Sequence, residues 1–115
     1  MPRDDDLYLG HMLDMARKAL ALTSGVEKDA FDGDEKLQLA VVHLIQVIGE
    51  AARRVSPESQ VAHSDIPWGA IVGMRHKVVH DYMGLDIDVV WDTVQNDLPE
   101  LARMLEVIVP DEAES

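Results

Sequence analysis

The segment from Asp34 to Val55 constrains the fold more than any other part of this chain, because as a helix it would be apolar on nearly every side. One apolar stripe recurs at helical spacing, and further apolar residues lie on the neighbouring faces. A helix of this kind has to be covered on several sides, so it is either central in the fold or buried at a subunit interface. The stripe is Leu37, Val41, Leu44, Ile48 and Ala51, and the other apolar positions are Val42, Ile45 and Val47.

One polar line interrupts this apolar helix. Its members follow one another at spacings of three and four, which places them on one face. Glu50 can form local ion pairs within the helix, or it can reach across to orient an arginine of another helix. The line consists of His43, Gln46, Glu50 and Arg53 or Arg54.

The rest of the chain also carries signals for helix starts and ends. Pro57 suits the first turn of a short helix, and Gly84 suits a left-handed cap at a helix end. Pro99 should kink the last helix, because proline has no N–H to donate to the carbonyl four residues back. Helices are expected from about Asp5 to Thr23, in a short segment from Ser56, from about Asp65 to near Tyr82, and from Asp86 onward.

No segment alternates between apolar and polar residues as a strand would, which predicts an all-α fold. The short connections favour an up-and-down bundle of four long helices plus one short helix. A chain of 115 residues is expected to form a single domain over 1–115, with 1–6 and 111–115 frayed. The chain has no cysteine, which excludes disulfides, thiolate catalysis and cysteine-based metal sites.

The net charge of −12 argues at first against nucleic acid, because phosphate binding depends on Lys and Arg. The charge is uneven, however: the stretch from Lys36 to His80 carries five cations and three acids, so the flanks carry −14. A weakly basic centre in an acidic shell can bind phosphate locally, and the acidic remainder suits a basic protein partner. No apolar run approaches the roughly 20 residues that cross a bilayer. We therefore expect no membrane contact and a cytoplasmic protein.

The segment from Arg75 to Tyr82 is the part of the sequence that indicates chemistry. It combines a permanently charged guanidinium, imidazoles that titrate near neutrality and a phenol within about two helical turns. Arg75 and His80 suit RNA cleavage without a metal, since the imidazole can deprotonate a ribose 2′-hydroxyl and the guanidinium can stabilise charge on the phosphate. The structural alternative is that Arg75 pairs with an acid and His80 caps the helix end.

Two geometric points bear on this interpretation. On a regular helix, residues five apart point roughly 140° from each other, so Arg75 and His80 would not share a face. The arginine would have to wrap, the helix end would have to distort, or a two-fold symmetric dimer would have to complete the site. His76 and His80 could hold a metal at their spacing of four, but two ligands are too few. We therefore expect no metal and no other cofactor.

The pattern Arg75-x4-His80-x-Tyr82 and its surroundings resemble the HepT toxins of the HEPN superfamily. The resemblance spans nearly all of the chain, from the first helix to about Leu105. One position departs from the pattern, since many relatives carry Asn or Asp directly after the motif arginine, where this chain has His76. The other matching parts are Ile48-Gly49-Glu50-Ala51-Ala52, Ile66-Pro67-Trp68, Gly84-Leu85-Asp86, Val90-Trp91 and Asn96-Asp97-Leu98-Pro99.

The resemblance implies an HEPN-like homodimer whose motif helices line a shared cleft. It implies an endoribonuclease toxin with Arg75 as phosphate clamp and His80 as acid/base. His76, at the position that departs from the pattern, could share the acid/base role, and Glu50 could support the site by orienting Arg75. It also implies a minimal nucleotidyltransferase antitoxin that transfers AMP to Tyr82, which would silence the nuclease because an anionic nucleotide repels RNA. The expected substrate is RNA, in some members transfer RNA, and not DNA. The competing class is a non-catalytic helical binding module that partners a nucleotidyltransferase.

Overall fold

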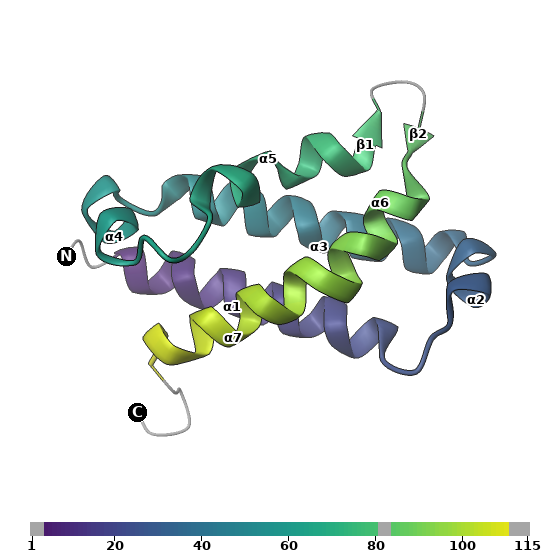
Figure 1. The fold of residues 1–115 in the computed structure, drawn as a ribbon, viewed down its shortest axis with the longest axis horizontal. Coiled ribbons are helices and arrows are strands. Elements are labelled where there is room, and N and C mark those ends of the chain that lie inside the picture. The colour runs from purple at the N-terminus through teal and green to yellow at the C-terminus, as the bar shows by residue number, and fades with distance from the viewer. Residues whose placement is uncertain (1–3, 81–83, 111–115) are drawn as a thin grey trace.

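The computed structural model describes residues 4–80 and 84–110, which form an antiparallel bundle of helices (Figure 1). Long helical segments run alternately in opposite directions, and two short helices and a small strand pair lie at their connections. The predicted all-α fold is confirmed, with one more short helix than expected. The long segments are α1 (Asp4–Thr23), α3 (Glu35–Arg54), α5 (Trp68–Val78) and the continuous run of α6 (Ile87–Asp92), the π-helix η2 (Thr93–Asp97) and α7 (Leu98–Ile108).

α3 is the central helix of the bundle, as its apolar sequence predicts. It packs against α1 on one side and α5 on another, while α7 lies against α1. Its inward residues Val41, Ile45, Ile48 and Ala52 are completely buried. Burial of a large aliphatic side chain contributes about 1.5–3 kcal/mol, so this helix anchors the fold and fixes where its polar line reaches the surface.

A buried carboxylate ties the start of α1 to the end of α3. Of the residues expected to fray at the amino end, Asp4–Asp6 are helical, and Asp5 is 2 % exposed. Its carboxylate accepts hydrogen bonds from the backbone N–H of Ser56 at 2.9 Å and from the Ser56 hydroxyl at 2.6 Å. The same hydroxyl accepts from the N–H of Ser59 at 3.2 Å and thereby caps the short helix α4 (Pro57–Ala62).

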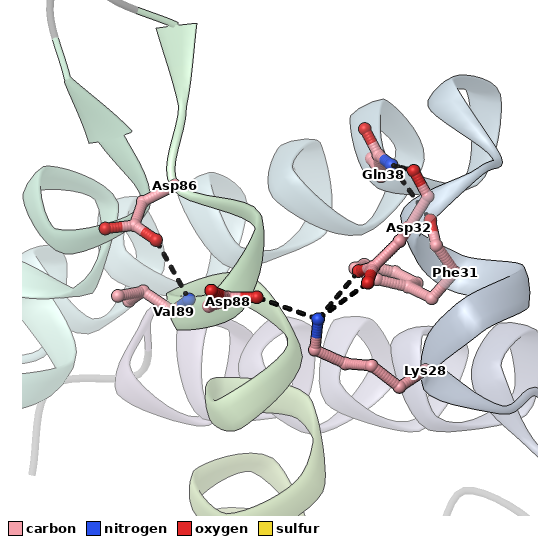
Figure 2. A network of polar contacts seen from close by, with 7 residues as sticks. All are labelled: Lys28, Phe31, Asp32, Gln38, Asp86, Asp88 and Val89. Carbon is pink, nitrogen blue, oxygen red and sulfur yellow. Dashed lines mark hydrogen bonds and ion pairs between the residues drawn. The ribbon is translucent and has the colours of Figure 1, made fainter.

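The short helix α2 (Lys28–Asp32) is absent from the sequence-based prediction. Its end is held by Gln38, whose amide donates to two carbonyls of the last turn at 2.8 and 3.0 Å. Lys28 donates to the carboxylates of Asp32 and Asp88, at 2.8 and 2.7 Å (Figure 2). The hydrogen bond to Asp32 is the main cause that raises the pKa of Lys28, and its contact with Asp88 joins α2 to α6.

α5 ends at Val78, which is earlier than the predicted end near Tyr82. Val79 has an extended backbone and begins a strand instead of a further helical turn. Consecutive β-branched residues lose side-chain freedom in a helix and suit an extended chain. The prediction of a helix that continues through His80 is therefore wrong.

A two-stranded antiparallel ribbon follows α5. Strand β1 (Val79–His80) pairs with β2 (Gly84–Leu85), with His80 opposite Gly84. The ribbon closes where the N–H of Asp86 donates to the carbonyl of Val78 at 2.9 Å. Gly84 has the positive φ expected of it, +96°, but it serves this ribbon and not a helix cap.

The last helix is irregular one turn before Pro99. In η2 the N–H of Leu98 donates to the carbonyl of Thr93, five residues back, which is the π-helical pattern. Pro99 has no N–H to donate to the carbonyl of Gln95. The irregular turn therefore lies where the sequence predicts a kink.

Candidate active site

α3 and α5 approach each other closely at Gly49. A methyl group on this residue would meet the carbonyl oxygens of Ile71 and Val72 at 3.3 and 3.4 Å. A larger residue would therefore push the two backbones apart. The close approach brings Glu50, the next residue of α3, within reach of Arg75 in the last turn of α5.

The carboxylate of Glu50 forms ion pairs with three arginines. Its Oε1 accepts a hydrogen bond from Arg53 and lies 3.8 Å from Arg54, and its Oε2 lies 3.7 Å from Arg75. The hydrogen bond from Arg53 is the main reason that the pKa of Glu50 lies below its usual value, and the three positive charges act in the same direction. Glu50 thus forms both kinds of contact that its sequence position allows, within α3 and across to α5.

An open pocket lies between α3 and α5 beside this carboxylate. Its lining includes Gly69 and Gly73, where a Cβ would meet nothing within 4 Å. Its walls include Arg53, Arg75 and His76, and its volume is about 170 Å³. The side chain of Arg75 is 49 % exposed. Its guanidinium can therefore contact a ligand in the pocket while the carboxylate holds it.

Of the two remaining predicted site residues, only the backbone of His80 is described. His80 lies in β1, two residues beyond the end of α5, and its side chain is not described; Tyr82 lies outside the described residues. Because Val79 and His80 form a strand, the angle expected between Arg75 and His80 on a continuous helix does not apply. Lys77 lines a different groove, between α5 and the η2–α7 segment.

Arg53 lines the candidate pocket, which the sequence did not reveal. From the sequence it is only a local partner for Glu50, and its place on the pocket wall is not apparent. The polar line on α3 is the signal that could have found it, because that line had to face solvent or another helix. Which helix lies beside it depends on the packing at Gly49, and residue spacing does not show that contact.

Among residues 4–80 and 84–110, no three His, Asp or Glu side chains are grouped as ligands for a metal ion. Within the same ranges, no helix combines the length and the apolar character that a membrane-crossing segment requires.

The chain is an all-α helical bundle of the HEPN superfamily, as its match to a family model of that superfamily shows. A family model described as ribonuclease HepT-like matches residues 12–108, and the chain belongs to this family. The "Probable ribonuclease HepT" of Thermococcus cleftensis is 32 % identical over 106 residues, which cover 92 % of this chain and 96 % of that protein. The "Putative RNase TTE0752" of Caldanaerobacter subterraneus subsp. tengcongensis is 32 % identical over 105 residues, which cover 91 % and 94 %. No solved structure matches the chain significantly.

Proposed function

We propose that this chain is a metal-independent endoribonuclease and the toxin of a toxin–antitoxin pair. Its membership of the HepT-like ribonuclease family supports RNA cleavage. The observation that carries the proposal is the position of Arg75, whose half-exposed side chain lines a pocket and forms an ion pair with Glu50 at 3.7 Å. A guanidinium held in this way matches two oxygens of a phosphate group.

In the proposed reaction, His80 acts as the acid/base on one ribose–phosphate linkage. The imidazole takes the proton of the 2′-hydroxyl, and the 2′-oxygen forms a bond to the adjacent phosphorus. The bond from phosphorus to the 5′-oxygen breaks, and this oxygen takes up a proton, for which His76 on the pocket wall is available. Arg75 stabilises the charge that grows on the phosphate oxygens. The products are a 2′,3′-cyclic phosphate and a free 5′-hydroxyl.

Tyr82 is the proposed regulatory residue, on the strength of its place in the motif. A minimal nucleotidyltransferase antitoxin would transfer AMP to it: the phenol oxygen bonds the α-phosphorus of ATP, and pyrophosphate leaves. An anionic nucleotide two residues beyond His80 would compete for the phosphate site and repel RNA. The acidic flanks of the chain suit a basic surface on such a partner.

The resemblance to HepT toxins also supports a homodimer that acts in the cytoplasm. The motif segments of the two protomers would line one cleft, so that each reaction can draw on side chains from both. Transfer RNA is the substrate to test first.

Cleavage of transfer RNA by the purified protein, in the presence of a metal chelator, tests this function. The wild-type protein should release fragments with 2′,3′-cyclic phosphates. His80→Ala should lower the rate by about 10²-fold or more, and Arg75→Ala by about 10²–10³-fold. Arg103→Ala is the control, because it removes another exposed arginine, on α7, that pairs with a glutamate three residues earlier in its own helix.

Two outcomes would contradict the proposal. Full activity of His80→Ala would remove the acid/base assignment. If the wild-type protein cuts no RNA but binds a nucleotidyltransferase, the non-catalytic binding module is the correct interpretation. Growth arrest upon expression of the chain alone, relieved by Arg75→Ala, would support the nuclease in cells.

A further inference from the structure

Arg53 occupies a position that the proposed catalytic residues do not explain. It lies on α3 and donates to one oxygen of the Glu50 carboxylate, while Arg75, on α5, lies by the other oxygen. Arg53 and Arg75 therefore reach the same pocket from two different helices, and both line it. Arg54 also lies near this carboxylate, at 3.8 Å, but it is not part of the pocket wall.

The charge at this pocket is opposite to the charge of the whole chain. Three guanidiniums share one carboxylate, which gives a local charge of +2 in a chain whose net charge is −12. One carboxylate neutralises one guanidinium, so the remaining positive charge attracts a further anion. The side chains of Arg53 and Arg75 are 61 % and 49 % exposed, so both can contact such an anion.

We propose that Arg53 is a second phosphate-binding residue, which contacts the RNA backbone beside the phosphate held by Arg75. This inference rests on the proposed ribonuclease function. An RNA strand that places one phosphate on Arg75 brings further phosphates with it, and contacts of arginine with phosphate fix the register of a nucleic acid. Gly69 and Gly73 of α5 line the same pocket, and a Cβ on either would meet nothing within 4 Å, so this part of the pocket wall is open to a bound strand.

Glu50 is the positioning residue for this pair of cations. Its Oε1 accepts a hydrogen bond from Arg53 and also lies near Arg54, and its Oε2 forms an ion pair with Arg75 at 3.7 Å. Both arginines are therefore placed before RNA binds, which reduces the entropy lost when the long side chains become ordered on a phosphate. Arg53 binds and aligns the strand, and the bond that breaks is next to Arg75.

The affinity for an RNA that cannot be cut, measured against salt concentration, tests the inference. A short single-stranded RNA with 2′-O-methyl groups serves as the probe, because it has no 2′-hydroxyl to react. Each phosphate contact contributes about 0.7 to the slope of log affinity against log salt for a single strand. Arg53→Ala should bind more weakly and lower this slope by about 0.7, and Arg53→Lys should keep most of the slope.

Two control variants decide between the pocket and a general effect of charge. Arg103→Ala removes a cation from α7, and Arg54→Ala removes one beside the pocket. Neither should lower the slope as Arg53→Ala does. If all three variants behave alike, or if Arg53→Ala binds as the wild type does, Arg53 is not a phosphate ligand. A wild-type protein that fails to cleave unmodified RNA while the Arg53 difference persists would instead contradict the proposed function alone.

Discussion

At the scale of single residues, the carboxylate of Glu50 organises the candidate site. It pairs with two arginines of α3, Arg53 and Arg54, and with Arg75 of α5. No other described glutamate pairs with three arginines. Removal of this charge would leave three cations close together without a counterion, and like charges repel. Glu50 is therefore expected to influence both the stability of the α3–α5 contact and the placement of Arg75.

The pH dependence of stability provides a test of these contacts. Because the pKa of Glu50 is lowered in the folded chain, its contribution is present above the usual value of 4.5 and is lost as the pH falls through the lowered value. The urea midpoint of Glu50→Gln should therefore lie below that of the wild type at neutral pH. The difference between the two urea midpoints should narrow as the pH is lowered below about 4.5. A difference that stays constant in acid would show that the loss comes from something other than this ionisation.

At the scale of helices and strands, the sequence predicts those elements whose signals are local. Apolar spacing locates α1 and α3, and Ser56 with Pro57 locates α4. The helix α2 is not predicted, because its five residues are too few to form a periodic pattern. It is stabilised by Gln38 and Asp88, which lie elsewhere in the chain. The predicted end of α5 is wrong because the pairing of β1 with β2 outweighs the helical pattern. That pairing is a tertiary contact, which local sequence signals do not show.

The candidate site is predictable to a similar extent. The sequence identifies Arg75 and Glu50 and allows for a contact between them, because both residues stand out chemically in their helices. It does not show that Arg53 faces the same pocket, since this depends on how closely α3 and α5 pack at Gly49. The site residues His80 and Tyr82 stay predictions.

The closeness of α3 and α5 at Gly49 predicts opposite effects for two glycine-to-alanine changes. Alanine in a helix is favoured over glycine by roughly 0.5–1 kcal/mol, so Gly10→Ala, which has nothing within 4 Å of its Cβ, should stabilise the protein. Gly49→Ala gains the same stabilisation from the helix preference of alanine, but its methyl group presses on two backbone carbonyls of α5. Overpacking costs about 1–3 kcal/mol, so the net effect should be destabilising.

Urea unfolding of both variants measures these changes in the free energy of unfolding. Gly49→Ala should also cleave RNA more slowly than Gly10→Ala under conditions where both are folded, because the contact between Glu50 and Arg75 lies next to it. If Gly49→Ala is as stable and as active as Gly10→Ala, the close packing of α3 on α5 is not what places the site.

At the scale of the whole molecule, the question is whether one chain or two complete the catalytic site. The angle between Arg75 and His80 on a continuous helix favoured a dimer, but α5 ends at Val78 and that argument no longer holds. The proposal of a homodimer now depends on the resemblance to HepT toxins alone. A mixing experiment can decide between the two arrangements.

Arg75→Ala and His80→Ala should each be inactive alone, yet recover activity when the two proteins are mixed and allowed to exchange subunits. In a shared cleft, a mixed dimer holds one intact arginine from one protomer and one intact histidine from the other. Random pairing makes half of the dimers mixed, and each has one of two possible arginine–histidine pairs, so recovery should reach about a quarter of wild-type activity. Native mass measurements on differently tagged protomers confirm the exchange. Exchange without any recovery would place both groups of each site within one chain, whether or not the protein is a dimer.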